Sequence, residues 1–209
     1  SVSAAQFENV VFPLGNLPKS EVREIARKHD LSTHAKKDST GICFIGERRF
    51  KDFLKTYLPV NPGDIVDVDG NHMGRHEGLM YHTLGQRQGL GIGGVKDRGE
   101  APWYVVAKDL TKNRLIVAQG NDHPALFCRN MTVTDIHWIN ESPALPTQLQ
   151  VKTRYRQPDQ ICRIDRKEDG YDIAFDLPQR AVTPGQWACF YDGDVCLGGG
   201  IIIRTDAWI

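Results

Sequence analysis

The chain has 209 residues, and its 26 lysines and arginines balance 26 aspartates and glutamates, so the formal net charge is zero. With 40% hydrophobic and 25% charged residues, the composition is that of a globular protein and excludes a chain disordered throughout. The charge balance excludes a strongly basic nucleic-acid binder but permits a local basic patch. No apolar run is long enough for a transmembrane helix, and we expect no membrane partner.

The cysteines favour neither a disulfide framework nor a zinc site, because their number is odd and no C-x-x-C pair occurs. The first ten residues lack the basic start and apolar core of a signal peptide. We therefore expect reduced thiols in a cytoplasmic protein. Three cysteines with apolar neighbours in predicted strands are expected to be core thiols. The five positions are Cys43, Cys128, Cys162, Cys189 and Cys196, and the predicted core thiols are the last three.

The first 60 residues predict a helical lead-in. Pro18 suits the first position of a helix, and the apolar spacing that follows is that of one helix face. A second helix is predicted over residues 47–58, ended by Pro59. A polar loop, residues 31–46, joins the two. The predicted buried faces are Val22, Ile25, Ala26 and His29 in the first helix, and Phe50, Phe53, Leu54 and Tyr57 in the second.

From residue 63 onwards the pattern is typical of strands. An Asp-Gly turn predicts one hairpin, and a second follows across residues 109–113. Further short strands come at about the 8–12-residue spacing expected of a barrel or sandwich. The predicted strands are 64–69, 72–75, 103–108, 114–118, 131–138, 147–156, 160–165, 171–176, 186–191 and 195–203.

We therefore predict a mainly β protein with three parts. Residues 1–60 form the helical lead-in, residues 61–121 a small β domain, and residues 122–209 an antiparallel β-barrel of about six strands. The lead-in is too short to bury a core of its own.

Residues 38–46 (DSTGICFIG) place Cys43 in a turn between glycines. Positive charge nearby lowers the pKa of a thiol and favours the nucleophilic thiolate. The alternative is a small buried side chain between Ile42 and Phe44, since free cysteine is commonly buried. The nearby cations are Lys36, Lys37, Arg48 and Arg49.

Residues 85–94 contain five glycines but match neither dinucleotide-binding nor P-loop spacing, so a nucleotide site there is not predicted. A tight turn is the simpler interpretation. Gln86 and Arg87 remain candidates for contact with RNA phosphate or a neighbouring domain. Three histidines in the same region, His72, His76 and His82, lack the spacing of a metal site, and we expect no metal.

Strand alternation over residues 151–157 predicts that Lys152, Arg154 and Arg156 share one face, with Tyr155 packing inward. Such a stripe suits RNA phosphates. The alternative is a solvated strand face. Gln186 follows a Thr-Pro-Gly turn, where its amide is either a contact to a base or sugar or simply a turn residue.

Seven motifs occur in order along the chain: residues 12–15 (FPLG), 21–23 (EVR), 38–46, 85–91 (GQRQGLG), 154–157 (RYRQ), 181–186 (AVTPGQ) and 198–200 (GGG). Together, over about residues 10–203, they resemble the tRNA-specific 2-thiouridylases. In that family an ATP-pyrophosphatase domain with an SGGxDS loop comes first, and this sequence contains no such loop. The resemblance therefore implies a central and C-terminal region, with residues 1–60 a remnant of the catalytic domain.

The resemblance implies that the full enzyme activates C2 of a wobble uridine in tRNA with ATP and Mg²⁺, both held by the preceding domain. No cofactor is expected in this chain. Cys43 matches the cysteine that carries persulfide sulfur from a relay protein and forms a disulfide with a cysteine of the preceding domain. We expect the fragment alone to be inactive.

The barrel of this family resembles the second domain of translation elongation factors and holds the tRNA body. The resemblance implies tRNA contacts by Arg154, Tyr155, Arg156 and Gln186, to which the charge pattern adds Lys152. The implied partners are wobble-uridine tRNAs, such as those for Glu, Gln and Lys, and a persulfide donor protein. Two other functions stay open: a non-catalytic RNA-binding β module and a redox-active thiol protein that uses Cys43.

Overall fold

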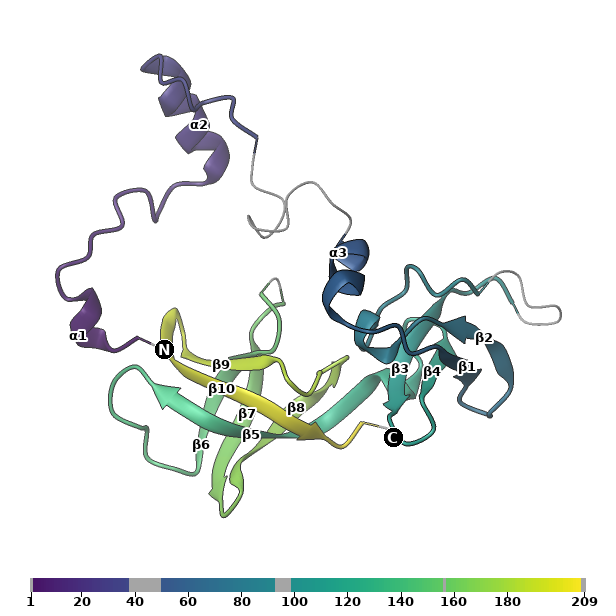
Figure 1. The fold of residues 1–209 in the computed structure, drawn as a ribbon. Coiled ribbons are helices and arrows are strands. Elements are labelled where there is room, and N and C mark those ends of the chain that lie inside the picture. Colours follow the sequence, from purple (N-terminus) through teal and green to yellow (C-terminus); the bar gives the residue numbers. More distant parts are fainter. Residues whose placement is uncertain (1, 38–49, 93–98, 156, 208–209) are drawn as a thin grey trace. The chain divides into compact units, whose positions relative to one another are not determined.

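The computed structural model describes residues 2–37, 50–92, 99–155 and 157–207. It divides into two compact units, which we describe separately: Ala4–Pro59, and Val60–Ile209 together with Ser1–Ser3. Figure 1 shows helices in the first unit and strands in the second. None of the helices in the described ranges has the length and apolarity needed to cross a bilayer.

The described residues of the first unit form three short helices, α1 (Ala4–Phe7), α2 (Lys19–Lys28) and α3 (Phe50–Tyr57). Helix α2 begins at Lys19, one residue later than predicted, because Pro18 is its N-cap and not its first residue, and α3 lies inside its predicted range. The predicted buried faces are only partly formed: Ile25 is 39% and Tyr57 is 70% exposed, whereas Val22, Ala26 and Leu54 are half-buried. Neither α1 nor α2 buries any residue, since helices this short have no partner layer within their own unit.

A four-stranded sheet begins the second unit, and both predicted hairpins are confirmed. Strand β1 pairs with β4 in parallel and with β2 antiparallel, so the sheet is mixed. The buried Asp67 carboxylate fixes the first turn by accepting hydrogen bonds from the backbone of Asp69 and Asn71. The strands are β1 (Gly63–Asp67), β2 (His72–His76), β3 (Trp103–Asp109) and β4 (Arg114–Gln119), in the order β2-β1-β4-β3.

The predicted antiparallel barrel is confirmed as six strands in one closed ring. Alternating residues point inward; in β7, Cys162 and Ile164 are fully buried between exposed neighbours. Glycines at 198–200 let β10 approach β5 and β9, because a Cβ at any of them would collide with backbone of those strands. The strands are β5 (Phe127–Trp138), β6 (Thr147–Lys152), β7 (Gln160–Lys167), β8 (Gly170–Arg180), β9 (Trp187–Asp192) and β10 (Val195–Thr205), closing in the order β10-β5-β8-β7-β6-β9.

A candidate RNA-binding groove on the barrel

One groove on the barrel brings together four of the five residues predicted to contact RNA. We call it the aromatic groove. The fifth residue, Arg156, lies outside the described residues, as does Cys43. The aromatic groove is lined by Lys152, Thr153, Arg154, Tyr155, Gly185, Gln186, Trp187, Cys189 and Tyr191.

The predicted stripe along one strand face is wrong beyond Lys152, where β6 ends. The next residues form a turn, in which the backbone N–H of Gln157 donates to the carbonyl of Arg154 at 3.1 Å. Pro158 follows and cannot donate to a strand ladder, which is a physical reason for the early strand end. Tyr155 is 93% exposed and does not pack inward.

Arg154 is held by the protein itself. Its Nη2 atom donates to the carbonyl oxygens of Leu84 and Ala181, each at 2.9 Å. Burial and the neighbouring Arg180 lower the pKa of the Arg154 guanidinium. The side chain therefore ties the loop before β3 to the loop after β8.

Gly85 permits this close approach. Its φ of +77° favours glycine, and a Cβ there would lie 2.7 Å from the Cβ of Ala181. Gln86, a candidate for RNA contact, instead stabilises its own loop. Its Oε1 accepts from the Thr83 backbone at 2.9 Å, and its Nε2 donates to the Gln88 carbonyl at 2.8 Å.

A chain of side-chain amides holds the turn that carries Arg154 and Tyr155. Thr153 Oγ1 donates to Gln157 Oε1 at 2.9 Å, and Gln157 Nε2 donates to Gln179 Oε1 at 3.1 Å. Gln179 Nε2 continues the chain to Gln160 Oε1 at 2.7 Å. Thr153 and Gln179 are each only 5% exposed. Sequence reasoning missed this network; the glutamines at 157 and 160 around the motif were its only signal.

Lys152 and Gln186 supply the polar side chains of the aromatic groove. The Lys152 ammonium lies 3.3 Å from Asp159 Oδ1 and 5.3 Å from the centre of the Tyr191 ring. The backbone of Gln186 is fixed, since its N–H donates to Thr183 and its carbonyl accepts from Ile202. Gln186 is therefore a turn residue whose side chain also lines the groove.

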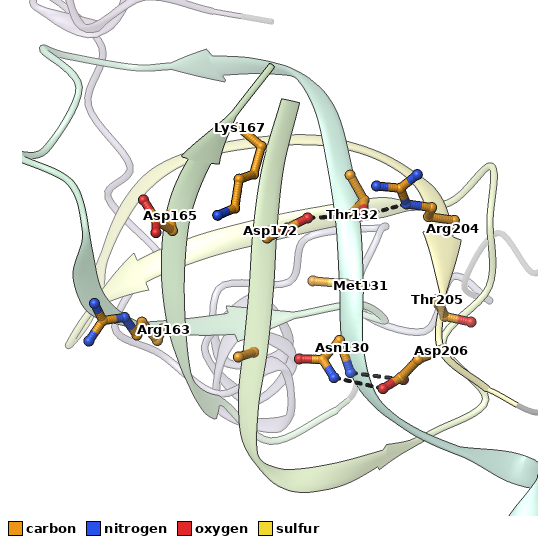
Figure 2. A pocket seen from close by; sticks show the side chains of 11 residues that line it. Asn130, Met131, Thr132, Arg163, Asp165, Lys167, Asp172, Arg204, Thr205 and Asp206 are labelled. Atoms are coloured by element: carbon orange, nitrogen blue, oxygen red, sulfur yellow. Dashed lines mark hydrogen bonds between the residues drawn. The ribbon is translucent and has the colours of Figure 1, made fainter. Parts of the chain in front are cut away.

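A second surface of the barrel, shown in Figure 2, carries more charge. We call it the charged hollow. Arg204 Nε donates to Thr132 Oγ1 at 2.9 Å, and Thr132 donates to Asp172 at 3.2 Å. Three cations there face three carboxylates, so the charges cancel. The charged hollow is lined by Asn130, Met131, Thr132, Arg163, Asp165, Lys167, Asp172, Ala174, Arg204, Thr205 and Asp206.

The thiols of the barrel differ in accessibility. Burial raises the pKa of Cys162 to about 12, as expected for a core thiol. Cys189 is half-buried and its pKa is raised, first by burial and then by Cys196. Cys196 is exposed, so its prediction as a core thiol is wrong. It lies beside the β9–β10 hairpin turn, where β10 has only just begun.

His76 and His82 are buried against each other, with ring centres 6.1 Å apart. His76 Nε2 also lies 3.1 Å from the Asn113 carbonyl, whereas His72 is exposed near Asp64. Within the described ranges, no three His, Cys, Asp or Glu side chains are grouped so that they can hold a metal ion.

Three models of tRNA-modifying proteins match this chain in succession. Residues 1–47 match a tRNA methyl transferase HUP domain, and residues 51–119 match a tRNA methyl transferase PRC-barrel domain. Residues 128–202 match an aminomethyltransferase beta-barrel domain. These matches define the chain's class by similarity: it resembles the domains of tRNA methyl transferase models along most of its length.

Curated relatives narrow the class. Proteins named tRNA-specific 2-thiouridylase MnmA are 60% identical in Pseudomonas fluorescens and 59% identical in Stutzerimonas stutzeri and Pseudomonas aeruginosa. Each match covers all 209 residues of this chain but only 55–56% of the relative. The chain is similar over its whole length to the tRNA-specific 2-thiouridylases, and it spans about half the length of these relatives.

Proposed function

We propose that this chain is the central and C-terminal part of an enzyme that places sulfur on C2 of the wobble uridine of tRNA. The observation that carries the proposal is a sequence identity of 59–60%, over all 209 residues of the chain, to proteins named tRNA-specific 2-thiouridylase. The matched models are named for methyl transfer, whereas the relatives matched over all 209 residues are named thiouridylases.

In this proposal Cys43 carries the transferred sulfur. A donor protein leaves a persulfide on Cys43, and its terminal sulfur attacks the adenylated C2 of uridine, so that the C2–O bond breaks and AMP leaves. A second thiolate then attacks Cys43, and the S–S bond breaks with its electron pair on the sulfur bound to C2. This step leaves a disulfide between the two cysteines, which a dithiol reductant reduces before the next cycle.

We assign ATP and Mg²⁺ to the part of the enzyme that this chain does not cover. The glycine-rich loop that begins at Gly85 packs against the sheet, since the backbones of Gly85 and Gln86 form hydrogen bonds with the backbone of Val105 in β3. This arrangement gives no support for a phosphate-binding role of the loop. We propose that this chain alone neither hydrolyses ATP nor thiolates tRNA, and that the whole enzyme works in the cytoplasm on tRNAs such as those for Glu, Gln and Lys.

The barrel, in this proposal, holds the tRNA body through the aromatic groove. The assembly of Lys152, Tyr155 and Gln186 around one groove supports this role. Arg154 supports it indirectly, by fixing the turn that carries Tyr155. The division into domains at residues 1–60, 61–121 and 122–209 remains a proposal, as does the RNA-contacting role of Arg156.

A non-catalytic RNA-binding module is the second candidate function for the chain as it stands. The aromatic groove favours this function because it needs neither ATP nor Cys43. The third candidate, a redox-active thiol protein, predicts activity that depends on Cys43 and is indifferent to tRNA.

The main proposal is tested by measuring sulfur transfer to tRNA. The enzyme used for this measurement joins this chain to the preceding region that the relatives also contain. Cys43→Ser is expected to abolish 2-thiouridine formation while leaving tRNA-dependent pyrophosphate release largely intact. Cys196→Ser is the matched control and is expected to leave both unchanged, because this thiol is exposed on the barrel. Full thiolation by the Cys43→Ser enzyme would overturn the proposal.

A further inference from the structure

The aromatic rings of the barrel fall into two groups. Trp138 packs against Phe190 and Tyr171 in the interior, with ring centres 5.8 and 6.3 Å away. Trp187 and Tyr155, both lining the aromatic groove, are 48% and 93% exposed. Within the described residues, neither takes part in a recorded ring contact. Large aromatic surface left in water at one groove indicates a binding function.

We propose that the aromatic groove binds one unpaired RNA nucleotide, with its base stacked on Trp187 and its phosphate beside Lys152. This inference rests on the proposed function and deepens it. It adds Trp187 as a contact residue and names the form of RNA that the groove takes.

The polar groups of the aromatic groove fit such a nucleotide. Lys152 supplies one positive charge near the rings, and this charge is partly offset by Asp159. A single ammonium group can bind one phosphate of an RNA strand but not a series of them. The Gln186 amide, which directly precedes Trp187, can donate to and accept from a base edge. One stacking ring, one amide and one cation are the elements with which proteins bind single-stranded RNA.

Both sides of the aromatic groove are fixed before any ligand binds. Trp187 begins β9 and is paired with Ile201 of β10, directly after the turn that Thr183 and Gln186 close. Tyr155 lies in the turn that the amide chain from Thr153 to Gln160 holds. Preformed sides reduce the entropy lost on binding.

A base in a duplex is unsuited to this groove, because its faces are already stacked and its edge is paired. Helical RNA would instead need several cations along its backbone. Residues 122–209, which form the barrel and its flanks, hold 9 basic and 12 acidic side chains. Unpaired nucleotides are therefore the form of RNA that the groove selects.

The test compares binding of a 12-nucleotide RNA without self-complementarity with binding of the same RNA annealed to its complement, using the 209-residue chain. Trp187→Ala is expected to weaken single-strand binding about tenfold and duplex binding by less than twofold. Trp187→Phe is expected to restore most of the loss, because it keeps a stacking face. Leu177→Ala, which removes an exposed apolar side chain from β8, is the matched control and should change neither.

Salt dependence separates stacking from charge. Trp187→Ala should keep the salt slope of single-strand binding, whereas Lys152→Ala should reduce it by about 0.7, the contribution of one phosphate. Unchanged single-strand binding by Trp187→Ala, or an equal loss for both RNAs, overturns the nucleotide site while leaving RNA binding by the barrel intact. If the unaltered chain binds neither these RNAs nor tRNA, the RNA-binding part of the proposed function fails as well. Thermal unfolding of each variant establishes that all are folded.

Discussion

The aromatic groove and the charged hollow lie on the same barrel, but their side chains are committed differently. In the charged hollow, three of the six charged side chains are hydrogen-bonded to neighbouring side chains: Arg204 to Thr132, Asp172 to Thr132, and Asp206 to Asn130. In the aromatic groove, Trp187 and Tyr155 face solvent. The comparison teaches that the number of cations on a surface says less about RNA binding than the groups left free to meet a ligand.

The largest effect on stability is expected from removing the Arg154 side chain. Although it lines the aromatic groove, it is hydrogen-bonded within the protein, as Arg204 is in the charged hollow. Arg154→Ala removes the side-chain donor to the Leu84 carbonyl and one of two donors to the Ala181 carbonyl, which keeps its hydrogen bond from Thr183 Oγ1. We expect the free energy of unfolding to fall by about 1–3 kcal/mol, the usual cost of losing hydrogen bonds to a charged group. Urea unfolding measures it.

Arg180→Ala is the matched control for Arg154, since it removes a neighbouring guanidinium that donates to one carbonyl, that of Asn121, and lies 4.8 Å from the centre of the Tyr104 ring. Its effect should be smaller. Unchanged stability of Arg154→Ala together with lost tRNA binding would show that Arg154 contacts phosphate directly, as the sequence suggested.

The second-largest effect is expected from a substitution that removes the hydrogen bonds holding the turn beside the aromatic groove. Gln179→Leu removes the middle of the amide chain and leaves the side chains of Gln157 and Gln160 without that partner. We expect tRNA binding several-fold weaker, because Tyr155 is then less well positioned, and stability lower by about 1–2 kcal/mol. Gln148→Leu, at an exposed position of β6, is the control for the substitution itself. Equal tRNA affinity of the two variants would contradict the positioning role.

The direct comparison of the two surfaces uses one cation from each. Lys152→Ala in the aromatic groove should weaken tRNA binding about three- to tenfold at low salt and flatten its salt dependence by close to one phosphate contact. Arg163→Ala in the charged hollow should leave both quantities unchanged, because carboxylates offset the charge there. Filter binding at several salt concentrations measures both. The comparison fails if Arg163→Ala has the larger effect.

Much of the fold could be predicted from the sequence because strand signals are local. The Asp-Gly turn and the alternation of residues 160–165 predict a hairpin and a strand without knowledge of the rest. The sequence also indicated Lys152, Tyr155 and Gln186, which line one groove although two of them precede the third by about thirty residues.

The fate of individual side chains could not be predicted, because it depends on distant partners. Arg154 binds carbonyls 70 residues before it and 27 residues after it, and nothing in residues 151–157 indicates this. Alternation alone wrongly placed Tyr155 inward, since the strand ends before it. Trp187 carries no signal of its own in the sequence, because a single aromatic residue in a strand is usually part of the core.

The smallest effect is expected at Asp206, on the edge of the charged hollow. Burial raises the pKa of its carboxyl, but hydrogen bonds from Asn130 and from the Arg129 backbone outweigh burial and hold it below the ordinary 3.8. A lowered folded-state pKa stabilises the protein above the unfolded value, and this contribution is lost as the pH falls through the folded value. Between pH 5 and pH 3, Asp206→Asn should therefore lose less stability than the unaltered chain, by under about 1 kcal/mol for so exposed a group. Asp194→Asn, at the exposed β9–β10 turn, is the control and should follow the unaltered chain. Urea unfolding at the two pH values measures this difference. If Asp206→Asn loses as much stability as the unaltered chain, the hydrogen bonds to the Asp206 carboxylate do not stabilise it. The contrast between the charged hollow and the aromatic groove is then weaker.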